Sequence, residues 1–304
     1  MLRRGSVLDL IGKTPMLSIS SDYSHPIFAK AEFLNPGGSI KDRIALHLIV
    51  CAEKEGKLKP GSIIVEATSG NTGIGVALVG VQKGYKVVIV MPESMSEERK
   101  KIIRALGAEL VPTPTSKSIQ GAVDKAADLA VRNRDAWLVD QFNNPHNPEV
   151  HYQTTGPEIW EQMEGVVDAF VAGVGSGGTL QGVGKFLKEK NPKLKLVAVE
   201  PEGASALLQQ EPGLHKLHQI QGIGDGFIPA VLDTSMIDEV ICVSDDDAIH
   251  QTRLLARKQG LLVGTSSGAN VWAARKVFEE LGPNAKVVTV LPDRAERYFS
   301  TALI

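Results

Sequence analysis

The sequence predicts an α/β fold in which parallel strands are covered by helices on both faces. Two observations carry this prediction: short runs rich in β-branched residues alternate with helical patterns, and the second half of the chain repeats the scheme of the first. Continuous apolar strands of this kind are typical of parallel sheets that are buried on both faces. The chain has 304 residues and is 43% hydrophobic, which allows one large or two mid-sized domains.

Each expected strand is a short apolar run that a turn residue closes. In the first half, we expect strands at 63–65, 86–91, 109–111 and 137–139, and helices at 73–83, 96–106 and 119–133. In the second half, we expect strands at 168–172, 195–200, 239–243 and 286–291, and helices at 179–189, 245–259 and 267–281. Right-handed crossovers place the loops that follow the strands along one edge of each sheet. The Asn- and Pro-rich segment 141–157 is expected to cross between domains.

Composition narrows the class of function. Charged residues make up 22% of the chain and the formal net charge is −2, which points to neither nucleic acid nor an anionic membrane as a partner. No signal peptide or membrane span is expected, and the isolated Cys51 and Cys242 show no CxxC or disulfide pattern, so we expect a cytoplasmic protein. The seven histidines include no HExxH motif, and we predict no metal site. The mixed-sign run 97–104 is interpreted as a solvated helix face.

A loop from Asn35 to Arg43 opens a helix and places Lys41 in the first turn of that helix. The helix dipole opposes a cation at this end, and desolvation would lower the pKa of the amine further. Both effects favour a nucleophilic or Schiff-base lysine. The alternative is a solvated lysine at a helix start.

A second loop, 68–73, joins a strand to a helix and reads Thr-Ser-Gly-Asn-Thr-Gly. Its hydroxyls, its amide and the backbone N–H groups of the helix N-terminus suit a small anion such as a carboxylate. Ordinary capping of the helix would need one such residue, whereas four polar residues are present here. We therefore favour a binding loop.

A third loop, 173–179, is rich in glycine and again lies between a strand and a helix. Its glycines allow close backbone approach, and its N–H groups can surround a phosphate. The loop also matches G-x-G-x-x-G, with Glu200 near the position of a ribose contact, so a nicotinamide-dependent dehydrogenase is an alternative. A fourth stretch, 264–268, precedes another helix, and its Ser266 is either a cap or a ligand of a nitrogen atom.

Together these loops resemble the cysteine synthase family, also called O-acetylserine sulfhydrylase, a branch of the cysteine synthase and cystathionine β-synthase group of fold-type-II pyridoxal-phosphate (PLP) enzymes. The resemblance covers nearly the whole chain, and its motifs occur in the family's order. They are 11–15 (IGKTP), 38–43 (GSIKDR), 68–73 (TSGNTG), 154–160 (TTGPEIW), 173–179 (GVGSGGT), 221–229 (QGIGDGFIP) and 296–301 (ERYFST).

The resemblance implies a tryptophan synthase β-like fold of two doubly wound parallel-sheet domains with the active site between them. It implies a smaller, mobile domain over 36–145 that carries the substrate loop. The larger domain would comprise 1–35 and 146–304 and would carry the PLP phosphate loop.

The resemblance also implies a role for individual residues. Lys41 resembles the catalytic Schiff-base lysine, which also acts as general base. The implied cofactor ligands are Asn71 at the ring hydroxyl, Gly175, Ser176, Gly177, Gly178 and Thr179 at the phosphate, and Ser266 at the pyridine nitrogen. The implied substrate-binding residues are Thr68, Ser69, Gly70, Asn71, Thr72, Gln141 and Gly222.

The implied activity is PLP-dependent β-replacement, which makes L-cysteine from O-acetyl-L-serine and sulfide through an aminoacrylate intermediate. A homodimer is implied, with the C-terminal tail of a serine acetyltransferase as a further partner. Alternatives within the class are cystathionine synthesis or the use of O-phosphoserine. Alternatives outside it are an NAD-dependent dehydrogenase or a non-catalytic PLP-binding regulator.

Two positions depart from the family pattern. Ile119 stands where the family commonly has methionine in the substrate site, so the acyl pocket is expected to differ. Asp225 adds a negative charge where small residues are common, which disfavours a phosphorylated substrate because like charges repel.

Overall fold

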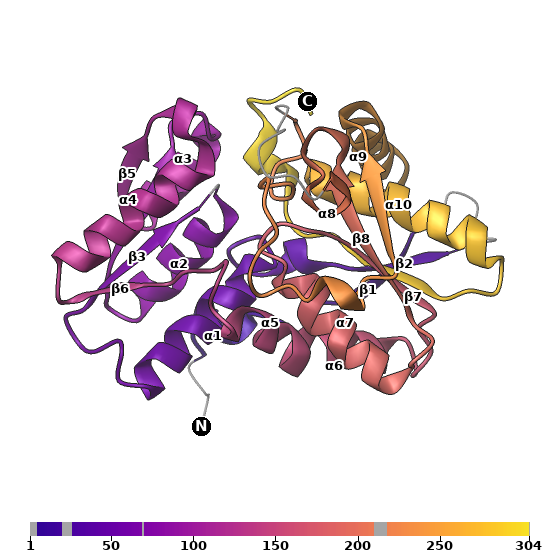
Figure 1. Ribbon diagram of the computed structural model, residues 1–304, viewed down its shortest axis with the longest axis horizontal. Helices are drawn as coiled ribbons and strands as arrows, with labels where there is room; N and C mark the ends of the chain where they lie inside the picture. The colour runs from indigo at the N-terminus through magenta and orange to yellow at the C-terminus, as the bar shows by residue number, and fades with distance from the viewer. Residues whose placement is uncertain (1–4, 20–25, 69, 210–217, 304) are drawn as a thin grey trace.

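The computed structural model describes residues 5–19, 26–68, 70–209 and 218–303. Two sheets lie on opposite sides of the molecule, each with its own helices (Figure 1). The strands are β1 Met16–Ile19, β2 Ile27–Lys30, β3 Ile63–Ala67, β4 Lys86–Pro92, β5 Glu109–Thr113, β6 Ala136–Leu138, β7 Ala169–Gly173, β8 Lys195–Pro201, β9 Glu239–Val243 and β10 Val287–Val290. The helices are α1 Lys41–Lys54, α2 Asn71–Gln82, α3 Glu97–Ala105, α4 Ser118–Arg132, α5 His146–Val150, α6 Gly156–Gln162, α7 Gly178–Lys190, α8 Ala206–Gln209, α9 Asp245–Gln259 and α10 Thr265–Leu281.

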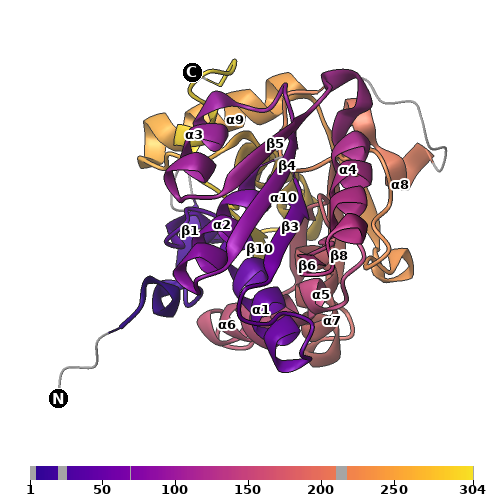
Figure 2. The ribbon, with the colours of Figure 1, turned by 90° about the vertical axis from the view of Figure 1, so that its left-hand side faces the viewer.

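The smaller sheet has the order β5-β4-β3-β6, and all its pairings are parallel. Alternate residues of its strands face opposite sides, as the period of two requires. Ile64 and Ile89 pack against α1, α2 and α3, whereas Val65 and Val88 pack against α4. Both faces are thus apolar and covered, and Figure 2 shows α4 and α2 on opposite sides of this sheet.

The larger sheet has the order β1-β2-β10-β7-β8-β9. Val171 and Val197 pack against α9 and α10 on one face, while Phe170 and Ala172 pack against α6 and α7 on the other. The predicted α/β class with two doubly wound parallel sheets is therefore confirmed. One edge of the larger sheet departs from the parallel arrangement, because β1 pairs antiparallel with β2. Neither of these two strands was expected from the sequence.

The segment 141–157, expected as a crossing between domains, is largely helical. It contains α5, a π-helical turn at His151–Thr155 and the start of α6. Its prolines allow this, because Pro145 precedes α5 and Pro148 lies in the first turn of α5, where a missing N–H costs little, and Pro157 follows the π-helical turn near the start of α6. The division into a mobile smaller domain and a larger one stays a prediction. Among the described residues, no helix has the length and apolar character that crossing a bilayer requires.

Candidate active site

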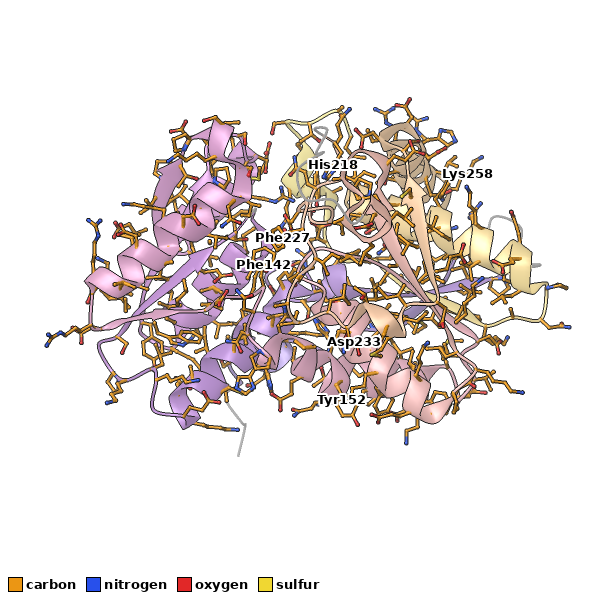
Figure 3. The ribbon with its side chains drawn as sticks, in the orientation of Figure 1. Phe142, Tyr152, His218, Phe227, Asp233 and Lys258 are labelled. Carbon is orange, nitrogen blue, oxygen red and sulfur yellow. The ribbon has the colours of Figure 1, made fainter. Side chains whose placement is uncertain are left out.

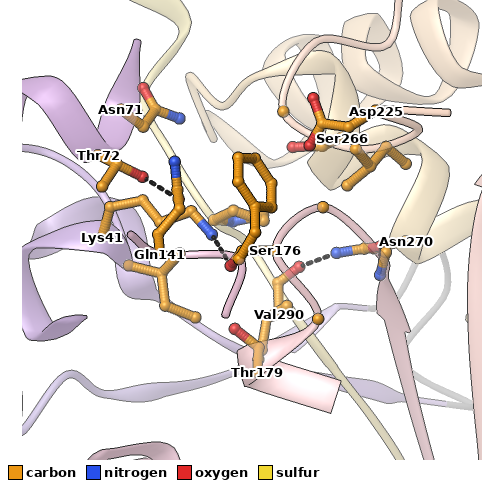
Figure 4. Close-up of a pocket in the computed structure, with 18 of the residues that line it drawn as sticks. Lys41, Asn71, Thr72, Gln141, Ser176, Thr179, Asp225, Ser266, Asn270 and Val290 are labelled. Atoms are coloured by element: carbon orange, nitrogen blue, oxygen red, sulfur yellow. Dashed lines mark hydrogen bonds between the residues drawn. The ribbon is translucent and has the colours of Figure 1, made fainter. Parts of the chain in front are cut away.

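Figure 4 shows side chains that line a pocket. The pocket lies at the carboxyl ends of strands from both sheets, because Gly173 and Val290 end β7 and β10, and Asn71 and Gln141 follow β3 and β6. This is the edge at which open α/β sheets bind ligands. The pocket is lined by most of the residues that the sequence singled out: Lys41, Asn71, Thr72, Gln141, Gly175, Ser176, Gly177, Thr179, Gly222 and Ser266. Thr68, Gly70 and Gly178 lie just outside the lining, and Ser69 lies outside the described residues.

Lys41 is the first residue of α1, and its side chain enters the pocket. Its Nζ donates to the Ser176 hydroxyl at 3.3 Å. Burial lowers the pKa of Lys41, and the nearby carboxylates of Asp225 and Asp293 only partly oppose this effect. A lysine with a lowered pKa keeps more of its amine neutral, which is the form that attacks a carbonyl or takes up a proton.

The loop between β3 and α2 offers side chains to the pocket. The Thr72 hydroxyl donates to Gln141 Oε1 at 2.7 Å, and Gln141 in turn donates from Nε2 to the Ala67 carbonyl at 3.2 Å. Thr68 turns inward and accepts the N–H of Gly70 at 2.9 Å. No described side chain caps the N-terminus of α2, so the capping alternative does not account for this run of polar residues. The N–H groups at this helix end remain available to an anion.

Arg99 corrects one expectation of the sequence analysis. It was placed on a solvated helix face, but its side chain is buried and lines the pocket. It hydrogen-bonds to Gln221, and its guanidinium lies 4.8 Å from the centre of the Tyr298 ring. It also packs on Gly70, whose φ of 147° and lack of a side chain leave room for it. The mixed charges of α3 gave no signal, because only the packing of α3 against the C-terminal segment turns Arg99 inward.

Asn71 holds an acceptor that lacks a partner in the described structure. Its Nδ2 donates to Asp293 Oδ2 at 2.7 Å, and the Tyr298 hydroxyl donates to the same oxygen at 2.5 Å. Burial, followed by the Asp293 charge, raises the pKa of Tyr298, which keeps its hydroxyl a donor. Asn71 Oδ1 is buried without a hydrogen bond to the described residues. Such an atom costs free energy unless a ligand donates to it.

The glycine loop at the start of α7 offers backbone to the pocket. Gly177 precedes the helix with φ 77°, and no described side chain caps this helix end. A Cβ at Gly175 would overlap the Gly222 carbonyl, and one at Gly178 would overlap Asn147, so the loop requires glycine at both positions. Asn147 also donates to the Ser176 hydroxyl at 3.1 Å. Uncapped N–H groups at a helix N-terminus form a site for a phosphate.

Asn270, a residue that the sequence did not single out, joins the ends of two strands at the pocket. It accepts the Gly173 N–H at 2.8 Å and donates to the Val290 carbonyl at 3.0 Å. An asparagine within a helix carries no sequence signal for such a role. At another part of the site, the rings of Phe142 and Phe227 meet edge to face at 5.0 Å (Figure 3).

Glu200 lacks the free carboxylate that a ribose contact would need. Its oxygens accept the Ser205 hydroxyl at 2.8 Å and the backbone N–H groups of Ala206 and Leu207. The side chain is buried and its acceptors are occupied by the start of α8. The dehydrogenase alternative rested on the G-x-G-x-x-G match and on Glu200 as a ribose contact. The structure removes the second of these observations.

The family model described as pyridoxal-phosphate dependent enzyme matches residues 7–293. The chain belongs to this family. Among curated relatives, the cysteine synthase of Staphylococcus aureus strain N315 is 51% identical over 302 residues, which cover 98% of this chain and 96% of the relative. Cysteine synthase A of Escherichia coli strain K12 is 48% identical over 303 residues, which cover 96% and 93%.

Solved structures of similar proteins share the whole fold. The O-acetylserine dependent cystathionine beta-synthase from Helicobacter pylori is 43% identical, with a TM-score of 0.93, and the match covers 100% of this chain and 99% of that one. A hydrogen sulfide-producing enzyme from Fusobacterium nucleatum is 41% identical, also with a TM-score of 0.93, over 97% and 99%. The chain is thus a PLP-dependent enzyme of the cysteine synthase kind, and the family assignment excludes the dehydrogenase alternative.

The pocket fits pyridoxal phosphate on three observations. Lys41 places an amine with a lowered pKa in the pocket. The N-terminus of α7 has no side-chain cap, and its glycine loop is too tightly packed for side chains. The orphaned Asn71 Oδ1 can accept the proton of a ring hydroxyl. An aldehyde requires the amine, a phosphate requires the uncapped helix end, and a ring hydroxyl requires the unpaired acceptor.

Proposed function

We propose that this enzyme replaces the acetoxy group of O-acetyl-L-serine with sulfide to form L-cysteine. The observation that carries the proposal is the position of Lys41 in one pocket with two uncapped helix ends, those of α2 and α7. The pocket thus has a place for a cofactor phosphate and a separate place for a substrate carboxylate, with an amine that can reach the substrate. The names of the curated relatives support the product.

In this proposal, Lys41 anchors the cofactor and then serves as general base. When bound, the cofactor supplies an electron sink for the negative charge that develops at Cα. Lys41 removes the Cα proton and returns it at the end of the cycle. The burial that lowers the pKa of Lys41 supports this role, because a base must hold an unprotonated amine near neutral pH.

The cofactor phosphate is assigned to the loop Gly175 to Thr179, with Gly178 contributing through its packing on Asn147. Asn71 is assigned to the ring hydroxyl, and Ser266, in the first turn of α10, to the pyridine nitrogen. A neutral serine does not enforce protonation of that nitrogen as a carboxylate would. The weaker electron sink favours prompt loss of the Cβ leaving group over longer-lived carbanion chemistry.

The substrate carboxylate is assigned to the start of α2. Thr72 and Gln141 supply polar atoms that their mutual hydrogen bond holds in place. Thr68 and Gly70 shape the loop through their own hydrogen bond, and Ser69 is assigned to the same site by the family resemblance alone. A Cβ at Gly222 would meet no described atom within 4 Å, so this position leaves room for the substrate.

A second cavity adjoins the pocket and is proposed to admit the acceptor and to release acetate. It shares Gly222, Ile223 and Asp225 with the pocket and extends past Met95 and Ile119. The Ile119 side chain therefore faces the region where the leaving group and nucleophile pass. Burial raises the pKa of Asp225, with Lys41 and His218 opposing, and any charge on it repels a phosphate leaving group.

The proposed partners rest on the family resemblance. They are a second copy of the chain in a homodimer and the C-terminal tail of a serine acetyltransferase. Light scattering of the purified enzyme tests the first, and a pull-down with a peptide from such a tail tests the second. The cytoplasmic location, the mobile smaller domain at 36–145 and the larger domain of 1–35 and 146–304 stay predictions.

The experiment that tests the function mixes the yellow holoenzyme with O-acetylserine, O-phosphoserine or serine and records the cofactor spectrum. We expect a rapid spectral change with O-acetylserine and a much weaker one with the other two. Sulfide, thiosulfate and homocysteine are then added in turn, and cysteine and cystathionine are quantified. A prompt change with serine followed by cystathionine would favour the cystathionine alternative, and a colourless protein without PLP would reject the proposal.

A further inference from the structure

Four side chains with metal-binding groups converge outside the pocket lining. They are His47, Cys51, His146 and Glu149, and one ligand atom of each lies within 4.8 Å of the others. None of the four lines the proposed active site. All four are half-buried, so the cluster is neither a solvated surface pair nor part of the apolar core.

Two helices hold the cluster. His47 and Cys51 are one turn apart on α1, and His146 and Glu149 are one turn apart on α5. Residues three or four apart share one face of a helix, so each helix presents a pair of ligands. The helices meet beside the cluster (Figure 1), where Val150 joins the apolar core that α1 forms with α2. The four ligand atoms are therefore held by packed elements and not by flexible loops.

Two of the distances among the ligand atoms match the edges of a tetrahedron around zinc, and all four atoms lie within 4.8 Å of one another. Bond lengths of about 2.0 Å to nitrogen or oxygen and about 2.3 Å to sulfur give edges of roughly 3.3 Å for N···O and roughly 3.6 Å for N···S. His47 Nε2 lies 3.3 Å from Glu149 Oε2 and 3.6 Å from Cys51 Sγ. His146 Nδ1 hydrogen-bonds directly to Glu149 Oε2, and a cation between these atoms would replace that proton.

The outer contacts of the cluster are those expected around a metal. The second ring nitrogen of His146, Nε2, lies 2.8 Å from Glu55 Oε1. A carboxylate in this position fixes the tautomer that leaves Nδ1 free to ligate and makes it more basic. Gln153 Nε2 donates to Glu149 Oε1 at 2.7 Å, which orients the other carboxylate oxygen toward the cluster.

We propose that His47, Cys51, His146 and Glu149 form a binding site for a divalent transition metal, with zinc as the best match. Two imidazoles, a thiolate and a carboxylate suit zinc better than magnesium or calcium, which prefer oxygen ligands. With all four positions filled by protein, the site is structural. It would tie α1, whose first residue is Lys41, to α5, whose Asn147 bonds Ser176 in the glycine loop.

The test is a titration of the chelator-treated PLP holoenzyme with Zn²⁺ and Co²⁺. We expect one Zn²⁺ per chain by competition with a chromophoric chelator. Co²⁺ should give intense d–d bands typical of a tetrahedral thiolate site, which lie at longer wavelength than the yellow cofactor band. Cys51→Ser and His146→Ala should each lose at least 100-fold in Zn²⁺ affinity, and Glu55→Gln should lose about 10- to 100-fold.

The matched control is Cys242→Ser, which removes the second cysteine and should leave Zn²⁺ affinity and the cobalt spectrum unchanged. The melting temperature of the wild-type enzyme should rise with Zn²⁺, and that of Cys51→Ser should not. These readouts do not depend on turnover. A weak, octahedral cobalt spectrum, or equal Zn²⁺ affinity in the wild type and Cys51→Ser, would overturn the proposal.

Discussion

The two helix ends that meet at the pocket differ in what they offer a ligand. At the start of α2, the polar atoms belong to side chains such as Thr72 and its partner Gln141. At the start of α7, they belong mainly to backbone that packs too closely for side chains, as the contact between Gly175 and Gly222 shows. The difference follows from the ligands we assign. A phosphate with near-threefold symmetry suits a ring of N–H groups, whereas a substrate that must be told apart from its analogues needs side chains.

The largest effect is expected at Lys41, which stands in the same pocket and belongs to neither helix end. Lys41→Ala removes both the cofactor anchor and the general base, and general-base catalysis alone contributes roughly 10²- to 10⁴-fold. We expect turnover to fall at least 1,000-fold while both loops stay folded. Steady-state assays of cysteine formation measure the loss, and circular dichroism checks the fold. Retention of normal activity would reject the role of Lys41.

The next effect separates the two helix ends. Gly175→Ala places a methyl group against the Gly222 carbonyl, and overpacking of this kind costs about 1–3 kcal/mol, or roughly 5- to 150-fold in affinity. We expect PLP affinity to fall by that factor, while the KM for the amino-acid substrate of the reloaded enzyme changes little. Fluorescence titration of apoenzyme with PLP measures it. Gly84→Ala, which strains a turn with open space around it, is the control and should bind PLP normally.

At the start of α2, we expect a substitution to raise the KM for the substrate and to leave PLP affinity unchanged. Thr72→Val removes the hydroxyl that donates to Gln141 and leaves the buried Gln141 Oε1 without a donor. A buried acceptor left unpaired costs about 1–3 kcal/mol of free energy. We expect the KM for O-acetylserine to rise about tenfold with PLP affinity and the resting spectrum unchanged. Thr72→Ser keeps the hydroxyl and should restore the KM. If Thr72→Val weakened PLP and spared the KM, the assignment of the two helix ends would be reversed.

The smallest effect on activity is expected from two buried acids in the sheets. Glu200 in β8 has hydrogen bonds to both oxygens, whereas Glu66 in β3 has one oxygen, Oε1, without a partner among the described residues. Burial raises the pKa of Glu66 from 4.5 to about 8. Between these values the folded protein holds a proton that the unfolded chain has released, so stability falls as pH rises, by at most about 1.4 kcal/mol per pH unit.

Glu66→Gln removes this titration. We expect the wild type to lose stability relative to Glu66→Gln as pH rises from 5 through about 8, with no further relative loss above that value. Urea unfolding at several pH values measures the difference. Glu200→Gln is the comparison in the other sheet. A constant difference between the wild type and Glu66→Gln across this window would show that Glu66 is ionised throughout.

The sequence alone determined what depends on neighbouring residues along the chain. Apolar runs and their turn residues predicted most strands to within two residues, and β9 and α9 match their predicted bounds. The glycine, hydroxyl and lysine patterns of the loops pointed to eight residues that line one pocket, and the family resemblance added Gln141 and Gly222. This works because strand period, helix starts and anion-binding loops are local properties of the backbone.

The tertiary structure alone decided what depends on segments far apart in the chain. Arg99 is buried because α3 packs against the C-terminal segment, and Asn270 acts at the pocket because α10 passes the ends of β7 and β10. The antiparallel β1–β2 edge and the cluster of His47 with His146 also depend on contacts between separate segments of the chain. The prediction of no metal site rested on spacing within single segments of the chain. The metal site that we propose instead joins two helices about 100 residues apart, and spacing within one segment carries no record of such a meeting.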